Sequence, residues 1–298
     1  MAEIKLFSLN GEVKECASSE VILEKELQTL IEQNMETFFG VRFLKSEYAV
    51  TNGRMDSIGI DENNSPVIFE YKRSQNENVI NQGLFYLDWL LDHKADFKLL
   101  VIEKLGMEAA NHIDWSVPCV ICVAHDFTKY DIHAVNQMQR NIKLVSYRKY
   151  DQDLILFEHL NVPTVKPVTE SAVNDSEPKG NTQKSHIEKL AAATDSMKNL
   201  YHSICDFIES LGDDIAPNQL KLYLAYKKVQ NMVCIEIYNK QIILFLKLNP
   251  DTVALESGFT RDMRGVGHYG TGDLQVVIKN AADFEKAKPL IERTYNET

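Results

Sequence analysis

The sequence predicts an α/β domain with a mixed β-sheet flanked by helices, followed by a second, smaller α+β domain. Up to about residue 160, helical and strand-like segments come in the order helix, three strands, helix, strand, helix, strand. A polar segment with three prolines then interrupts this pattern over 161–188, and new helices and strands follow it. We therefore expect a domain at 1–160, a flexible linker at 161–188 and a domain at 189–298.

The first domain is expected to open with a strand at 3–7 and a helix over 18–40. Ser18 or Ser19 can cap this helix, and Gly40 can end it. Strands are predicted near 41–50, 55–60 and 66–72. The remaining predicted elements are helices at 79–93, 95–103 and 128–140, and strands at 118–124, 142–150 and 154–160.

The second domain is expected to begin with one long helix at 187–211. Strands are predicted at 221–229, 232–248 and 274–279, and a closing helix at 281–295. The order of these segments favours an α+β arrangement.

The composition is that of a globular protein without a membrane segment. The chain has 298 residues, of which 44% are hydrophobic and 25% charged. No apolar run approaches the roughly 18 residues that a bilayer-spanning helix needs, and the first residues do not resemble a secretory signal. Five cysteines, an odd number, favour reduced thiols and a cytoplasmic location.

Two of these cysteines, Cys119 and Cys122, form a C-x-x-C pattern. A redox or zinc site would need this pattern at a turn or a helix start, or a second pair of ligands. The pattern lies instead inside a strand-like run, where residues three apart point to opposite faces. We expect buried structural thiols.

The formal net charge of −11 counts against a general nucleic-acid binder, because phosphate neutralisation dominates the affinity of such proteins. It leaves room for a local basic patch or a bound metal ion.

The stretch GRMDSIGIDENNSPVIFEYKR, residues 53–73, places charges on two apolar strands. If a polar turn at 61–65 closes an antiparallel hairpin centred on Asn63, Asp56 lies opposite Glu70. Residues two apart on a strand share a face, so Glu70 and Lys72 project together. Two facing carboxylates repel each other unless something compensates their charge.

A divalent cation would remove that repulsion. Mg²⁺ uses one or two protein carboxylates together with water and phosphate oxygens, and it can activate water against a phosphodiester. Lys72 could stabilise negative charge or position the water. The alternative is a surface hairpin that carries a Glu–Lys pair by chance.

The same stretch resembles the Asp…Glu-x-Lys signature of the restriction-endonuclease-like, PD-(D/E)XK, superfamily, with Met55 in place of the usual Pro. The resemblance covers roughly residues 20–160 and implies the superfamily's mixed sheet. It implies a metal-dependent endonuclease in which Asp56 and Glu70 bind Mg²⁺ or Mn²⁺ and Lys72 assists the water. The expected partner is nucleic acid, with DNA favoured, and a homodimer is possible.

Further residues match the NucS-like and RecB-like branches. Gln82 and Tyr86, on one face of a helix, resemble their Q-x-x-x-Y element, which contacts the nucleic-acid backbone or braces the metal site. The alternative is that Tyr86 is a core residue and Gln82 an ordinary polar one. Arg54 resembles the basic residue that precedes the metal-binding Asp in NucS-like proteins, and the resemblance implies that it contacts a phosphate of the nucleic acid. The superfamily also places a carboxylate on its first helix, and Glu24 is favoured over Glu26 because it lies nearer the apolar stripe. A solvated surface charge is the alternative for either residue.

The second domain contains the glycine-rich stretch TRDMRGVGHYGTGD, residues 260–273. Its glycines permit close approach to a ligand, and Arg261, Arg264 and His268 could contact a phosphate or nucleic-acid backbone. The alternative is a glycine-rich connection between strands. This domain and the nuclease-like domain resemble an uncharacterised bacterial family in which the two are fused.

The predicted function is metal-dependent hydrolysis of nucleic acid. The alternative is a non-catalytic nucleic-acid-binding or protein-interaction module that retains the nuclease fold.

Overall fold

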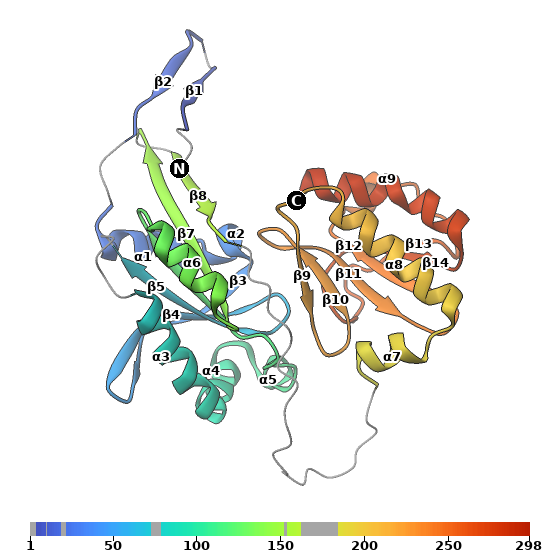
Figure 1. The fold of residues 1–298 in the computed structure, drawn as a ribbon, viewed down its shortest axis with the longest axis horizontal. Helices are drawn as coiled ribbons and strands as arrows, with labels where there is room; N and C mark the ends of the chain where they lie inside the picture. Colours follow the sequence, from blue (N-terminus) through green and yellow to red (C-terminus); the bar gives the residue numbers. More distant parts are fainter. Residues whose placement is uncertain (1–3, 10, 19–21, 73–78, 152–153, 162–183) are drawn as a thin grey trace. The chain divides into compact units, whose positions relative to one another are not determined.

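A computed structural model describes residues 4–9, 11–18, 22–72, 79–151, 154–161 and 184–298. Most of the expected linker at 161–188, namely residues 162–183, lies outside the described residues. The chain forms two compact units, each built on a six-stranded sheet (Figure 1).

The sheet of the first unit has the strand order β3-β4-β5-β6-β7-β8. The pairs β4/β5 and β7/β8 are antiparallel, whereas β5/β6 and β6/β7 are parallel. The predicted mixed sheet is therefore confirmed. Its strands are β3 (Val41–Val50), β4 (Gly53–Asp61), β5 (Pro66–Lys72), β6 (Cys119–Ala124), β7 (Asn141–Tyr150) and β8 (Leu154–His159).

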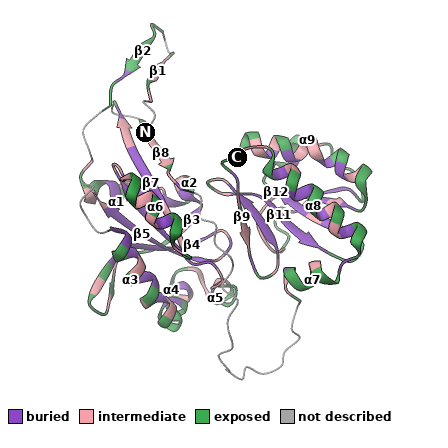
Figure 2. Ribbon diagram, viewed as in Figure 1, coloured by how far each residue is buried: buried purple, intermediate pink, exposed green. Residues whose placement is uncertain are grey.

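Helices lie on both faces of this sheet, and its central strands are buried (Figure 2). Leu27 and Ile31 of one helix join a core cluster with Phe69 of β5 on one face. On the other face α3 packs against β5 and β6, and a side chain at Gly83 would come within 2.5 Å of Val120. The helices are α1 (Glu24–Gln33), α2 (Met35–Phe39), α3 (Val79–Asp92), α4 (Lys94–Leu105), α5 (Met107–Asn111) and α6 (Lys129–Gln137).

The single helix predicted over 18–40 is wrong in two respects. Helix α1 begins at Glu24 with Leu23 at its N-cap, so neither serine caps it; Ser18 forms a bridge with Tyr150, and Ser19 lies outside the described residues. The helical run also breaks at Asn34, whose side-chain amide donates to the Leu30 carbonyl at 2.9 Å and competes with the backbone pattern.

Other elements predicted in this unit agree better with the structure. Gly40 ends α2 in the left-handed conformation, with φ of 64°, as predicted. The strand predicted at 3–7 is β1 (Leu6–Ser8), which pairs with the unpredicted β2 (Lys14–Cys16). Helix α5 was also not predicted.

The two cysteines of the C-x-x-C pattern lie on opposite faces of β6, as predicted. Cys119 belongs to the core cluster on the α1 face. The Cys122 thiol lies 3.9 Å from the Val79 carbonyl oxygen at the start of α3. All five cysteines of the chain are buried and unpaired, which confirms the expectation of free thiols.

The sheet of the second unit is antiparallel throughout, in the order β13-β14-β12-β11-β10-β9. Three helices pack over the apolar side chains of one of its faces and enclose the largest core of this unit. The strands are β9 (Ala216–Gln219), β10 (Leu224–Lys227), β11 (Asn231–Ile237), β12 (Ile242–Leu246), β13 (Thr260–Asp262) and β14 (Leu274–Ile278), and the helices are α7 (His186–Ala192), α8 (Asp195–Glu209) and α9 (Ala281–Glu297), with a 3₁₀ turn at Pro250–Thr252.

Two predicted elements of this unit are each split in the structure. The helix expected at 187–211 is α7 and α8, because Thr194 accepts a hydrogen bond from the Met197 N–H and caps a new helix. The strand expected at 232–248 is the hairpin of β11 and β12, closed where the Tyr238 N–H donates to the Gln241 carbonyl. Strands β9 and β13 were not predicted. No helix in the described parts of the chain is long and apolar enough to cross a membrane.

We predict that the second unit loses stability in mild acid through His186. Its ring is fully buried, with Nε2 2.9 Å from the Tyr201 hydroxyl, and burial lowers its pKa from 6.5 to about 4. Between these values the unfolded chain binds a proton that the folded chain does not, so stability falls as the pH falls below 6.5. At pH 5 this loss amounts to about 2 kcal/mol.

Denaturant unfolding at pH 7 and pH 5 measures this loss. His186→Gln should shrink the difference between the two pH values, although the variant starts less stable. The exposed His202 of α8, changed to Gln, serves as the matched control. An unchanged acid loss in His186→Gln would contradict the prediction.

Candidate active site

The hairpin of β4 and β5 has the predicted register. Ser57 lies opposite Phe69, and the pairs between the strands centre on Asn63. The Asp61 carboxylate accepts hydrogen bonds from the N–H groups of Asn63 and Ser65, at 2.9 and 2.8 Å, and so fixes the turn.

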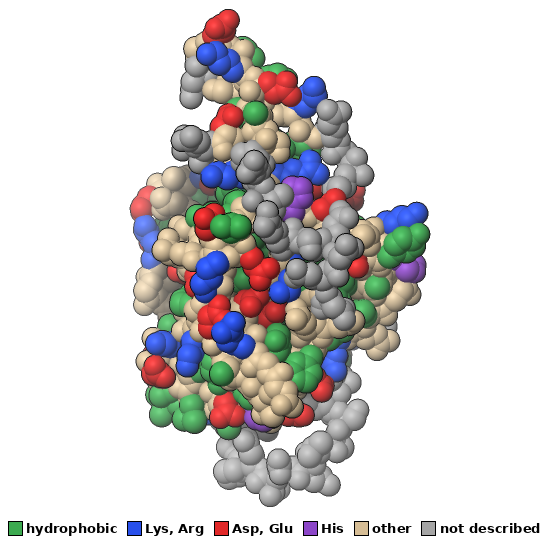
Figure 3. Space-filling view, turned by 90° about the vertical axis from the view of Figure 1, so that its left-hand side faces the viewer, with side chains coloured by type: hydrophobic (Ala, Val, Ile, Leu, Met, Phe, Trp, Pro, Cys, Tyr) green, Lys and Arg blue, Asp and Glu red, His purple; other side chains and the backbone are tan. Residues whose placement is uncertain are grey.

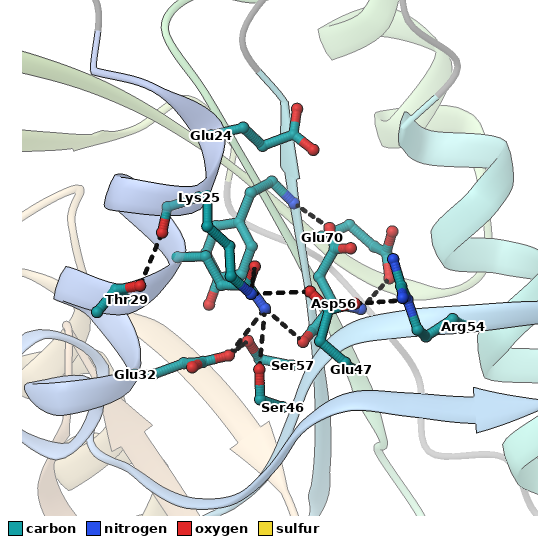
Figure 4. A network of polar contacts seen from close by, with 12 residues as sticks. Glu24, Lys25, Thr29, Glu32, Ser46, Glu47, Arg54, Asp56, Ser57 and Glu70 are labelled. Carbon is teal, nitrogen blue, oxygen red and sulfur yellow. Dashed lines mark hydrogen bonds and ion pairs between the residues drawn. The ribbon is translucent and has the colours of Figure 1, made fainter.

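Asp56 and Glu70 occupy the next position of this register. Each carboxylate binds the backbone of the other strand: the Asp56 N–H donates to Glu70 Oε1 at 3.3 Å, and the Tyr71 N–H donates to Asp56 Oδ2 at 3.0 Å. The two acidic side chains therefore face each other at the point where the hairpin ladder ends, as Figure 4 shows.

The surroundings of this pair disfavour its ionised form. Glu70 is only 2% exposed, and burial, followed by the charge of Asp56, raises its pKa from 4.5 to about 9. Burial also raises the pKa of Asp56, although the Tyr71 N–H and the charge of Lys72 act in the opposite direction. At neutral pH the pair therefore retains a proton unless a cation replaces it.

Lys72 and Glu24 complete the group predicted from the sequence. The Lys72 ammonium lies 3.6 Å from Glu24 Oε1, at the first residue of α1. The charge of Glu24 raises the pKa of both Asp56 and Glu70, so all four groups share one electrostatic environment. Glu26, the other carboxylate considered, is exposed.

Asp56 and Glu70 are the residues that could hold a divalent cation. Among the described residues, no three His, Cys, Asp or Glu side chains are grouped so as to bind a metal ion. A pair of carboxylates nevertheless fits Mg²⁺, which completes its coordination with water and phosphate oxygens. The donor set fits for a second reason, since a cation between the two facing carboxylates, of which Glu70 is buried, would remove their mutual repulsion.

A polar network under β4 was not predicted. Gln28, only 4% exposed, donates to the Asp56 carbonyl at 2.8 Å and to Glu32 at 2.9 Å. Glu32 in turn accepts a 2.6 Å hydrogen bond from the Ser57 hydroxyl, so α1 supports both residues of the strand (Figure 4). One feature of the sequence could have indicated this network: the polar Gln28 directly follows Leu27, which belongs to the apolar stripe of the helix.

The Q-x-x-x-Y residues have different environments. Gln82 is exposed, whereas Tyr86 is only 8% exposed and accepts a 3.3 Å hydrogen bond from the Arg54 N–H. A side chain at Gly53 would lie 2.8 Å from the Tyr86 ring, so this ring packs closely under the β3–β4 turn. The Arg54 side chain itself is exposed and contacts Glu47.

The three residues predicted in the second unit have different environments. Arg264 is bound by the carboxylates of Asp251 and Asp262, both at 2.7 Å. His268 stacks on Phe245 with ring centroids 4.3 Å apart. Arg261 is exposed on β13. The stretch connects β13 to β14, which pair with each other.

We predict that Glu70→Gln stabilises the metal-free protein at alkaline pH. Because the folded-state pKa of Glu70 exceeds its unfolded value, the folded chain holds a proton that the unfolded chain loses, and stability falls as the pH rises from about 4.5 to about 9. A neutral amide removes this loss. Chemical unfolding at pH 8 with EDTA should show a gain of roughly 1–3 kcal/mol. Glu26→Gln is the control on α1, and an equal gain in it would contradict the prediction.

The chain matches known proteins over this site and along its whole length. Residues 23–111 match the family model of the endonuclease NucS C-terminal domain. An uncharacterised protein of Haemophilus influenzae is 30% identical over 298 residues, which is 97% of this chain and 99% of that protein.

Similar solved structures cover only part of the chain. One is a repair endonuclease from Pyrococcus abyssi, at 19% identity, a TM-score of 0.29, 44% of this chain and 50% of that one. Another is EndoMS in a dsDNA complex, at 21% identity, a TM-score of 0.26, 43% of this chain and 47% of that one. The chain thus spans about half the length of these two proteins.

The site described above lies within the matched segment, since Glu24, Asp56, Glu70, Lys72 and Tyr86 all fall between residues 23 and 111. The chain belongs to one family with the Haemophilus influenzae protein, and its residues 23–111 are similar to the endonuclease NucS C-terminal domain.

Proposed function

We propose that the chain is a metal-dependent nuclease that hydrolyses phosphodiester bonds in DNA. The observation that carries this proposal is the pair of facing carboxylates, the partly buried Asp56 and the buried Glu70, with Lys72 on the same strand as Glu70. Such a pair is unfavourable in a merely structural hairpin. The match of this segment to a domain named for an endonuclease supports the reaction, and the choice of DNA over RNA is part of the proposal.

Asp56 and Glu70 would hold Mg²⁺ or Mn²⁺. When bound, the ion would polarise the phosphate and lower the pKa of a bound water. Both carboxylates must be ionised to bind it, so the raised pKa of Glu70 means that metal binding releases a proton. The affinity for metal should therefore increase as the pH rises from 6 towards 9.

Lys72 would act on the reacting phosphate, and Glu24 would position Lys72. Lys72 lies on β5 two residues from Glu70, and its ammonium can stabilise negative charge that develops on the phosphate. Glu24, 3.6 Å away, holds this ammonium at the end of the strand. The Lys72 side chain is 14% exposed, which limits competition from solvent.

We place the protein in the cytoplasm, where five unpaired thiols would remain reduced. A homodimer would offer two such sites to the two strands of a duplex, and its presence is measurable by light scattering.

We predict that Asp56→Ala and Lys72→Ala each lower DNA cleavage at least about 100-fold, because one variant removes a metal ligand and the other a charge-stabilising group. The measurement is cleavage of labelled duplex DNA and RNA with Mg²⁺, Mn²⁺ or EDTA. Lys98→Ala, at an exposed lysine of α4, controls for the loss of a cation.

Metal binding gives a readout that does not depend on the substrate. Mn²⁺ should raise the melting temperature of the wild type and of Lys72→Ala, but not that of Asp56→Ala. Salt-sensitive DNA binding with no cleavage under any metal would instead support a binding module. Equal cleavage by wild type and both variants would reject the assigned residues.

We also predict that Gln82 and Tyr86 act differently. Tyr86→Phe removes the acceptor for the Arg54 N–H and should cost about 0.5–1.5 kcal/mol of stability. Gln82→Ala, at an exposed position, should leave stability unchanged and raise KM for DNA. Unfolding measurements and steady-state cleavage on both variants test this difference, and a stability loss in Gln82→Ala alone would reverse the assignment.

A further inference from the structure

A carboxylate held between two cations lies beside the Asp56–Glu70 pair. Glu47 Oε1 accepts a 3.0 Å hydrogen bond from Lys25 Nζ, and Glu47 Oε2 lies 2.5 Å from Arg54 Nε (Figure 4). The three residues come from α1, β3 and β4, so separate elements converge on this point. Figure 4 shows the Glu47 carboxylate beside Asp56.

The cations of this group are exposed to solvent, whereas the carboxylate is only partly exposed. The side chains of Lys25 and Arg54 are 67% and 64% exposed, whereas that of Glu47 is 29% exposed and its Oε2 is shielded. Exposed ion pairs contribute only about 0–1 kcal/mol to stability. Stability alone therefore gives little reason for this arrangement.

The backbone of Glu47 is strained. Its φ is 52°, in the left-handed region, in the middle of strand β3. A residue with a side chain loses roughly 1–2 kcal/mol in this conformation relative to extended backbone. Such strain persists where the surrounding contacts require it, and it is concentrated at functional sites. Here the strained residue delivers its carboxylate to Lys25 and Arg54.

We propose that Lys25 and Arg54 form a binding site for a backbone phosphate of nucleic acid, and that Glu47 occupies this site in the free protein and leaves it when the phosphate binds. Carboxylate and phosphate are recognised by the same ammonium and guanidinium donors. Arg54 is two residues from Asp56 on β4, so the bound phosphate would neighbour the carboxylate pair. The inference rests on the proposed function for its substrate class.

The exchange of Glu47 for a phosphate would make the site selective for a polynucleotide over free anions. The chain carries a net charge of −11, and on the face that Figure 3 shows, acidic and basic side chains are interspersed, with a group of acidic side chains near the middle. A free anion would have to displace Glu47 and would gain contacts at this one site only. A polynucleotide gains contacts at several phosphates at once, so it can compensate for this displacement.

Glu47→Gln tests the exchange because it removes the competing charge and keeps the side-chain shape. Binding of a fluorescent DNA duplex of about 20 base pairs is measured by anisotropy in EDTA, at 150 mM salt, where charges more than about 8 Å apart are largely screened. We expect Glu47→Gln to bind about tenfold more tightly than the wild type. Glu26→Gln, which changes the net charge equally on α1, should differ from the wild type less than twofold.

The double variants Glu47→Gln/Arg54→Ala and Glu47→Gln/Lys25→Ala locate the effect. Each should lose most of the tenfold gain, because the phosphate would lack one of its two cations. Lys25→Ala and Arg54→Ala should each reduce the slope of log affinity against log salt by about 1.

Three results would overturn the inference: no gain in Glu47→Gln, a gain equal to that in Glu26→Gln, or a gain that survives undiminished in both double variants. The proposed nuclease function fails on another measurement, the absence of cleavage by the wild type with Mg²⁺ and Mn²⁺. Cleavage with no gain in Glu47→Gln would therefore reject the phosphate site and leave the nuclease proposal intact.

Discussion

The repulsion between two facing carboxylates is the constraint on which the site depends. The register of the β4–β5 hairpin leaves no choice about their position, because a shift by one residue would turn each side chain to the opposite face. The surrounding sheet then buries Glu70 almost completely. A folded chain can carry such a pair only if the rest of the unit supplies enough stability to hold it.

That support comes from a helix on the other face of the sheet. The Gln28 amide donates to the Asp56 carbonyl, and the neighbouring Ser57 hydroxyl donates to Glu32, so α1 fixes the position of β4. The acidic side chain of Asp56 points away from α1. The core formed by Leu27 and Ile31 anchors the helix itself. The polar group and the apolar cluster thus depend on the same element, and a change that shifts α1 would move the carboxylates as well.

The sequence was sufficient to predict the features of the fold and the site that depend on the local pattern of apolar and polar residues. The alternation of strands and helices gave the mixed sheet, and the polar turn around Asn63 gave the hairpin register that brings Asp56 to Glu70. Helix breaks at Asn34 and Thr194 were missed because side-chain hydrogen bonds to the backbone decide them, against an otherwise continuous helical pattern. The role of Gln28 depends on contacts with residues 18 and 28 positions away, which periodicity does not report.

Strand β6 carries a thiol on each of its two faces, Cys119 beneath one helical layer and Cys122 beneath the other. A reagent in solution reaches either sulfur only when the layer above it opens. Mass spectrometry of chemically labelled protein, read at each cysteine separately, would therefore follow the opening of the two layers independently, with no probe added to the chain.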